Sequence, residues 1–165
     1  EYLEMIRLKT AVLLAASLKI GARLGGASVE DADRLYDFGM HIGVAFQLKD
    51  DLLDVYGNAK VFGKNIGGDI LCNKKTYMLI KALEHANADQ HNQLNSWINA
   101  ETFQPAEKIA AVTELYDRIG VKAVCENKIL EYSNRAMESL AAVSIAEEKK
   151  EELKKIIENL IHREV

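Results

Sequence analysis

Apolar residues recur every three or four positions along most of this chain, which is the spacing of one face of an α-helix. The alternation of apolar and polar residues that is typical of a β-strand does not persist anywhere in the sequence. We therefore predict an all-α fold. Helices are expected over about residues 2–20, 29–56, 73–86, 105–119 and 121–142, and from residue 144 onward.

Several helix ends carry recognisable signals. Ser28 and Ser144 are each followed three positions later by an acid, which resembles a capping box at a helix N-terminus. Pro105 suits the first turn of a helix. Glycines and lysines in residues 57–73 predict a mobile loop, and the polar residues 87–96 predict a turn or a frayed helix.

Two further features concern packing. Gly39 and Gly43 lie about one helical turn apart, where small residues allow a neighbouring helix to come close. The charged run from Glu147 to Lys155 is expected to form the solvated face of the last helix, opposite its apolar stripe.

Composition narrows the class of protein. The 165 residues are 48% hydrophobic and 28% charged, which suits one globular domain. The formal net charge of −4 argues against a nucleic-acid-binding surface. No apolar run approaches the roughly 20 residues needed to span a bilayer. Cys72 and Cys125 form neither a metal-binding nor a disulfide pattern, so we expect a cytoplasmic protein.

Three acids within the helix expected over 29–56 give the clearest chemical signal. Asp50, Asp51 and Asp54 fall within about 100° of arc, so their carboxylates repel one another. On a helical wheel Asp50 lies about 40° from Phe46 in the apolar stripe, whereas acids on a solvated face would lie opposite that stripe. A partly buried acid needs a partner, and oxygen ligands suit Mg²⁺ shared with phosphate. We therefore predict a magnesium site.

The loop that follows favours phosphate binding. Within residues 62–69, glycines would let backbone amides approach a ligand, Lys64 supplies a cation and Asp69 supplies a further oxygen. Residues 73–76 then open the next helix, whose N-terminus favours anions. Beside the acids, this loop is interpreted as the other half of a clamp for Mg²⁺ and diphosphate. Lys9, taken alone, is more readily a surface lysine whose stem lies along apolar neighbours.

Together these segments resemble the trans-prenyl diphosphate synthases, the polyprenyl synthetase family. The matching motifs, in chain order, are Lys9-Thr10-Ala11 (the lysine–threonine motif), residues 46–54 (the second aspartate-rich motif), and residues 63–69 with Lys74 and Thr76 (the flexible loop). Their order is the one that the family has, which makes the resemblance specific. The residues from 77 onward carry no signature.

The resemblance implies an isoprenoid-synthase-type helical bundle, a homodimer, and an enzyme that condenses isopentenyl diphosphate with an allylic diphosphate in isoprenoid biosynthesis. Mg²⁺ would bridge the acids and the allylic diphosphate. Loss of the diphosphate group would then leave an allylic carbocation. By position, the metal ligands would be Asp50, Asp51 and Asp54, with Asp69 acting through water. The diphosphate would be bound by Lys9, Lys64 and Lys74. The catalytic residues would be Lys9, Thr10 and Gln47.

One departure from the family pattern limits this interpretation. The first aspartate-rich motif has no match, because residues 31–34 (Asp-Ala-Asp-Arg) are too short and lie too late in the chain. Glu1 is not an initiator, and the helical pattern already begins at Tyr2. We therefore expect residues 1–165 to be the C-terminal portion of a longer all-α synthase domain, without its upstream half and inactive alone.

Three alternatives remain. A non-catalytic regulatory subunit would have eroded acids or lysines, whereas the motifs here are intact. A terpene cyclase would carry asparagine and serine in its second metal motif, which residues 50–54 lack. A helical interaction module with surface acids would show no coupled binding of Mg²⁺ and diphosphate.

Overall fold

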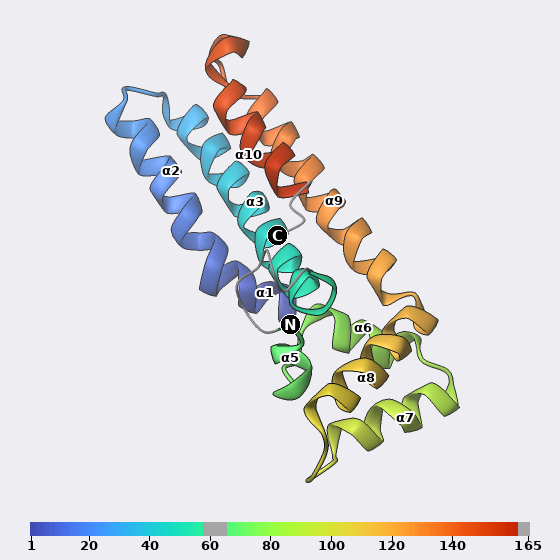
Figure 1. Cartoon of the computed structure of the whole chain (residues 1–165). Helices are drawn as coiled ribbons and strands as arrows, with labels where there is room; N and C mark the ends of the chain where they lie inside the picture. The colour runs from blue at the N-terminus through green and yellow to red at the C-terminus, as the bar shows by residue number, and fades with distance from the viewer. Residues whose placement is uncertain (58–65, 162–165) are drawn as a thin grey trace. The chain divides into compact units, whose positions relative to one another are not determined.

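A computed structural model describes residues 1–57 and 66–161, and the secondary structure in these ranges is helical throughout (Figure 1), which confirms the predicted all-α fold. The elements are α1 (Tyr2–Ile6), the π-helix η1 (Arg7–Ala11), α2 (Val12–Leu24), α3 (Val29–Tyr56), α5 (Gly68–Leu71), α6 (Tyr77–His85), α7 (Ala88–Ile98), α8 (Pro105–Ile119), α9 (Val121–Ala141), the 3₁₀-helix η2 (Glu147–Lys149) and α10 (Glu151–Ile161). No helix in the described ranges combines the length and apolarity needed to cross a bilayer.

The chain forms two compact units. The first comprises Glu1–Lys49 with Asn127–Arg163, and the second comprises Asp50–Glu126 with the last two residues. Helices α3 and α9 each contribute residues to both units.

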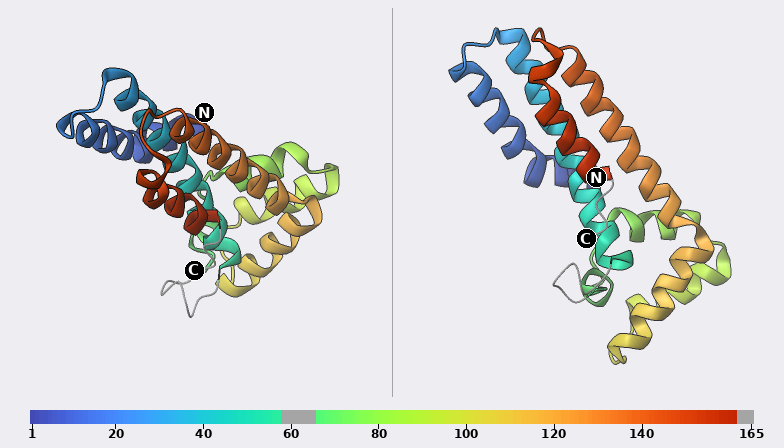
Figure 2. Two further views of the ribbon diagram at one scale, coloured as in Figure 1. Left: turned by 90° about the horizontal axis from the view of Figure 1, so that it is seen from above. Right: turned by 45° about the horizontal axis from the view of Figure 1, so that its top comes forward.

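The first unit is a helical bundle in which α2, α3, α9 and α10 run side by side (Figure 2). Glycines bring α2 and α3 close together: a Cβ atom at Gly39 would lie 2.7 Å from Ala15 Cα, and one at Gly43 would lie 2.6 Å from Ala11 Cα. Both distances are below van der Waals contact. The prediction that these glycines admit a neighbouring helix is therefore confirmed.

The first helical segment differs from the single helix predicted over residues 2–20. The π-helical turn at Arg7–Ala11 interrupts it, and α2 then continues past Gly21 to Leu24. A π turn inserts one residue into an α-helix without changing its apolar spacing much, so sequence periodicity does not reveal it. Such turns are frequent at functional sites.

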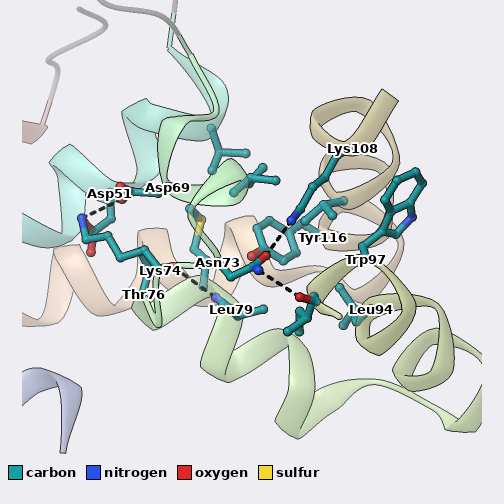
Figure 3. Close-up of a pocket in the computed structure, with 15 residues that line it drawn as sticks. Asp51, Asp69, Asn73, Lys74, Thr76, Leu79, Leu94, Trp97, Lys108 and Tyr116 are labelled. Atoms are coloured by element: carbon teal, nitrogen blue, oxygen red, sulfur yellow. Dashed lines mark hydrogen bonds and ion pairs between the residues drawn. The ribbon is translucent and has the colours of Figure 1, made fainter. Parts of the chain in front are cut away.

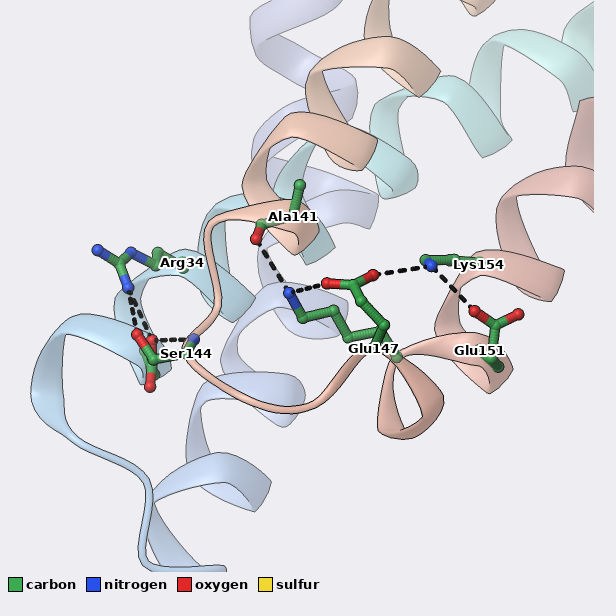
Figure 4. Close-up of polar contacts among 8 residues, drawn as sticks. Arg34, Ala141, Ser144, Glu147, Glu151 and Lys154 are labelled. Carbon is green, nitrogen blue, oxygen red and sulfur yellow. Dashed lines mark hydrogen bonds and ion pairs between the residues drawn. The ribbon is translucent and has the colours of Figure 1, made fainter.

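The two predicted capping boxes turn out differently. Ser28 Oγ accepts a hydrogen bond from the Asp31 backbone N–H at 3.0 Å, as expected of a helix cap. The Asp31 carboxylate instead accepts from the Ser144 N–H at 2.9 Å and from the Arg34 guanidinium at 2.8 Å (Figure 4). Ser144 therefore does not begin a helix, and the prediction there is wrong: α10 begins at Glu151.

Lys150 contradicts the prediction that the charged run 147–155 is uniformly solvated. Its side chain is 2% exposed, and its Nζ donates to the Ala141 carbonyl at 2.9 Å and to Glu147 Oε1 at 2.8 Å (Figure 4). The lysine satisfies a carbonyl at the end of α9, where no further helical N–H is available. It thereby holds the turn between α9 and α10.

In the second unit, α8 packs against α5, α6 and α7. Helix α7 was predicted as a turn or a frayed helix, and this is wrong. Its N-terminus has a complete capping box in which Asn87 and Gln90 bind each other's backbone N–H at 2.9 and 3.0 Å. Helix α8 starts at Pro105, as predicted, and ends at Gly120 with a φ of 82°.

We expect Gly43→Ala to lower the free energy of unfolding of this chain by about 1–3 kcal/mol, because the added methyl group overpacks the contact with Ala11. Urea denaturation measures the change. Gly21→Ala is the matched control, since nothing lies within 4 Å of its Cβ position and alanine favours a helix by up to about 1 kcal/mol. Equal stability of the two variants would show that Gly43 is not needed for close packing.

Candidate functional site

The acids predicted on α3 lie in the second unit, and Asp51 is the deepest of them. Its side chain is 1% exposed, whereas Asp50 and Asp54 are half-buried. The wheel that placed Asp50 beside the buried stripe is wrong, because Phe46 is 43% exposed and Leu48 is buried. This part of α3 is buried around most of its circumference. The positions of its apolar residues therefore do not show which face of the helix is exposed.

Lys74 brings the acids of α3 and of the loop together. Its Nζ lies 2.7 Å from Asp69 Oδ2 and 3.3 Å from Asp51 Oδ1 (Figure 3). Partial burial alone would lower the pKa of Lys74, but the hydrogen bond to Asp69 and the charge of Asp51 outweigh it, so the pKa of Lys74 is raised. The ammonium therefore stays charged and offsets the repulsion between two carboxylates.

Asp54 anchors the end of the loop to α3. Its Oδ2 accepts from the Asp69 N–H at 2.9 Å, and its backbone carbonyl accepts from the Gly67 N–H at 2.6 Å. Gly67 has a φ of 84°, in the left-handed region where glycine is favoured. Burial is the main cause that raises the pKa of the Asp54 carboxyl, and the charges of Asp69 and Asp50 add to it.

The segment around Lys74 is a turn, not the start of a helix as predicted. The Lys74 N–H donates to the Asp69 carbonyl at 2.9 Å. Thr76, which is buried, forms the cap of α6 by accepting from the Leu79 N–H at 3.3 Å, and the helix begins at Tyr77. The structure therefore gives Thr76 a capping role.

The predicted catalytic residues lie in the first unit. Thr10 belongs to the π-helical turn η1 and donates through Oγ to Gln47 Oε1 on α3 at 3.2 Å. Lys9 precedes Thr10 in the same turn and is exposed. The structure thus joins Thr10 with Gln47. Lys64, predicted to bind diphosphate, lies outside the described residues.

The donors in the second unit fit a hard divalent cation in their chemistry. Asp51, Asp54 and Asp69 offer only oxygen ligands; Asp51 and Asp69 pair with Lys74, and Asp54 accepts from the Asp69 N–H. As they stand, no three His, Cys, Asp or Glu residues within 1–57 and 66–161 are arranged to hold a metal ion. Binding a metal here would require the carboxylates to turn from Lys74, so the metal site stays a prediction.

Sequence reasoning missed Lys108 on α8. This lysine is 1% exposed, and its Nζ donates to Asn73 Oδ1 at 2.7 Å (Figure 3). A signal was present: Lys108 precedes the buried residues Val112, Leu115 and Tyr116 by four, seven and eight positions, which is the spacing of one helical face.

Comparisons with known proteins agree with these motifs. The sequence profile of the polyprenyl synthetase family matches residues 1–116. The chain is 35% identical over 164 residues to a short chain isoprenyl diphosphate synthase of Methanothermobacter thermautotrophicus, a match that covers 99% of this chain and 49% of the relative.

Solved structures give the same result. A geranylgeranyl pyrophosphate synthase is 35% identical with a TM-score of 0.91, over 99% of this chain and 51% of that one. A geranylgeranyl pyrophosphate synthase of Corynebacterium glutamicum, complexed with isoprenyl diphosphate and magnesium, is 32% identical with a TM-score of 0.84, over 95% and 44%. The chain spans about half the length of these proteins. Because the family profile covers more than half of the chain, the chain belongs to the polyprenyl synthetase family.

Proposed function

We propose that this chain supplies the metal- and diphosphate-binding half-site of a trans-prenyl diphosphate synthase, which condenses an allylic diphosphate with isopentenyl diphosphate. The observation that carries the proposal is the pairing of Lys74 with Asp51 and Asp69, together with the hydrogen bond from the Asp69 N–H to Asp54. These residues come from two of the three motifs that the sequence shares with the family, the second aspartate-rich motif and the flexible loop. Their retention does not favour a non-catalytic subunit.

Mg²⁺ is the proposed cofactor. Asp50, Asp51 and Asp54 would hold it, with Asp69 acting through water, since oxygen donors suit this ion. When bound, Mg²⁺ supplies positive charge that stabilises the departing diphosphate. The related synthase of Corynebacterium glutamicum is described in complex with magnesium and isoprenyl diphosphate, which supports this choice.

The protein groups would act on the substrate beside the metal. Lys9, Lys64 and Lys74 would bind the diphosphate as point charges. Thr10 and Gln47, joined by their hydrogen bond, would lie near the reacting carbon. Their mutual orientation is then fixed before substrate binds, which reduces the entropic cost of positioning.

The other wall of the site would come from a further helical segment. The chain contains no first aspartate-rich motif, and its relatives are about twice as long. Apolar side chains on η1 and α2 also face solvent, since Leu8 is 54%, Leu13 73% and Leu24 85% exposed. Exposed apolar surface of this extent is typical of an interaction site. We place the complete enzyme in the cytoplasm as a homodimer.

This proposal predicts no prenyl transfer by the 165-residue chain alone and normal transfer by a longer protein that includes the first aspartate-rich motif. Incorporation of labelled isopentenyl diphosphate in the presence of Mg²⁺ measures this. In the longer protein, Asp50→Ala should lower turnover by about 100-fold or more, because it removes charge stabilisation of the leaving group. Asp37→Ala, an exposed acid on the same helix, is the control. Turnover by the 165-residue chain alone would refute the proposal that this chain supplies only half of the site.

A second prediction concerns binding without turnover. In calorimetric titrations of the 165-residue chain with inorganic diphosphate, Mg²⁺ should increase the affinity at least about tenfold, or ~1.4 kcal/mol. Asp50→Ala should remove the effect of Mg²⁺, and Asp37→Ala should retain it. Equal affinity with and without Mg²⁺ would favour a helical module with surface acids over the proposed enzyme.

A further inference from the structure

Lys108 is a buried ammonium in the second unit. Its Nζ donates to Asn73 Oδ1 at 2.7 Å (Figure 3). It also lies 4.2 Å from the centroid of the Phe103 ring. Burial lowers the pKa of Lys108, as expected of a cation removed from water. A buried charge is costly unless it is hydrogen-bonded. Its partners in the described part of the chain are an amide oxygen and an aromatic face, which distinguishes it from a lysine in an ordinary ion pair.

Asn73 is held at both ends of its side-chain amide. Its Oδ1 accepts from Lys108 on α8, and its Nδ2 donates to the Ile98 carbonyl at the end of α7 at 2.9 Å. Its backbone has a φ of 50°, the only positive value at a non-glycine residue in the described ranges. Asparagine visits this left-handed region more readily than most residues, but the conformation still needs support. The two hydrogen bonds provide that support.

The orientation of Asn73 determines where the next residue points. Lys74 follows it directly, its N–H binds the Asp69 carbonyl at 2.9 Å, and its Nζ reaches Asp69 and Asp51. A change of the Asn73 backbone toward negative φ would rotate the Lys74 side chain away from these carboxylates. The direction of Lys74 therefore depends on the hydrogen bonds of Asn73.

The side chain of Lys108 lies inside the protein, beside a small cavity. The cavity lined by Lys108, Asn73, Tyr116 and Asp69 has a volume of ≈ 20 Å³, which is room for about one water molecule. Lys108 is 1% exposed, and its ammonium contacts neighbouring protein groups.

We infer that Lys108 is a positioning residue: by binding Asn73, it fixes the turn that aims Lys74 at Asp51 and Asp69. The consequence for diphosphate binding rests on the proposed function. The positioning itself does not, because it concerns contacts within the chain.

The test measures the reactivity of Lys74 in the 165-residue chain without metal or substrate. Acetic anhydride labels neutral amines, so an ammonium held between two carboxylates reacts slowly, and mass spectrometry gives the rate for each lysine. Lys108→Met keeps the apolar stem and removes the donor. Asn73→Gly keeps access to positive φ and removes the amide. Lys122→Met is the control, since it removes an exposed lysine from the same unit.

We expect Lys108→Met and Asn73→Gly each to raise the labelling rate of Lys74 about fivefold, and the double variant to add little, because both remove the hydrogen bond between Lys108 and Asn73. Lys122→Met should leave the labelling rate of Lys74 within about twofold of its rate in the unsubstituted 165-residue chain. Lys81, which pairs with Glu84 in the same unit, reports global loosening and should keep its rate in all variants.

An unchanged Lys74 rate in the folded Lys108→Met chain would overturn the inference, as would a rise shared equally by Lys81. If Lys108→Met does not fold by circular dichroism, the Asn73→Gly chain decides by the same criteria. Titration with inorganic diphosphate and Mg²⁺ is the separate readout of the proposed function. Absence of binding by the parent chain would refute that function and leave the labelling result to stand.

Discussion

The Lys74 ammonium holds two acids of the second unit together, Asp51 on α3 and Asp69. Asp51 is 1% exposed, and a carboxylate at that depth requires a hydrogen-bonded or charged partner. Lys74 itself is 44% exposed, so solvent screens the attraction, and Lys74 is one of the partners of the buried Asp51 carboxylate. Pairs such as Lys155 with Glu152 differ in kind, because both of their side chains are largely exposed and contribute little.

Asp54 explains why the loop returns to α3 at this place. One residue accepts two backbone N–H groups of the loop, from Gly67 through its carbonyl and from Asp69 through its carboxylate. These bonds set the position of the Asp69 side chain, which Lys74 then joins to Asp51. The spacing of Asp51 and Asp54 on one helix thus has a structural consequence in addition to its proposed part in metal binding.

Local periodicity predicted much of the fold, and its failures have physical causes. Helices α3 and α8 begin and end at the predicted residues, because caps, proline and glycine mark their ends. The depth of Asp51 could not be predicted, since α3 is buried on several sides there. The pairing of Lys74 with Asp69 depends on the loop path, which periodicity does not contain. Helix α7 was missed because its stability depends on its capping box and on packing against α8.

Two buried lysines in this chain show that a charged residue in the sequence does not always mark a solvated position. Lys150 lies in a charged run that was predicted to be solvated, and Lys108 lies on the amphipathic helix α8, yet each is almost fully buried. Lys150 donates to the Ala141 carbonyl at the end of α9 and to Glu147, whereas Lys108 donates to the side chain of Asn73. In both cases a long apolar stem lets the ammonium reach a hydrogen-bond acceptor from a buried position. A lysine in such a position acts through hydrogen-bond geometry more than through charge, so its effect appears in the turn that it fixes.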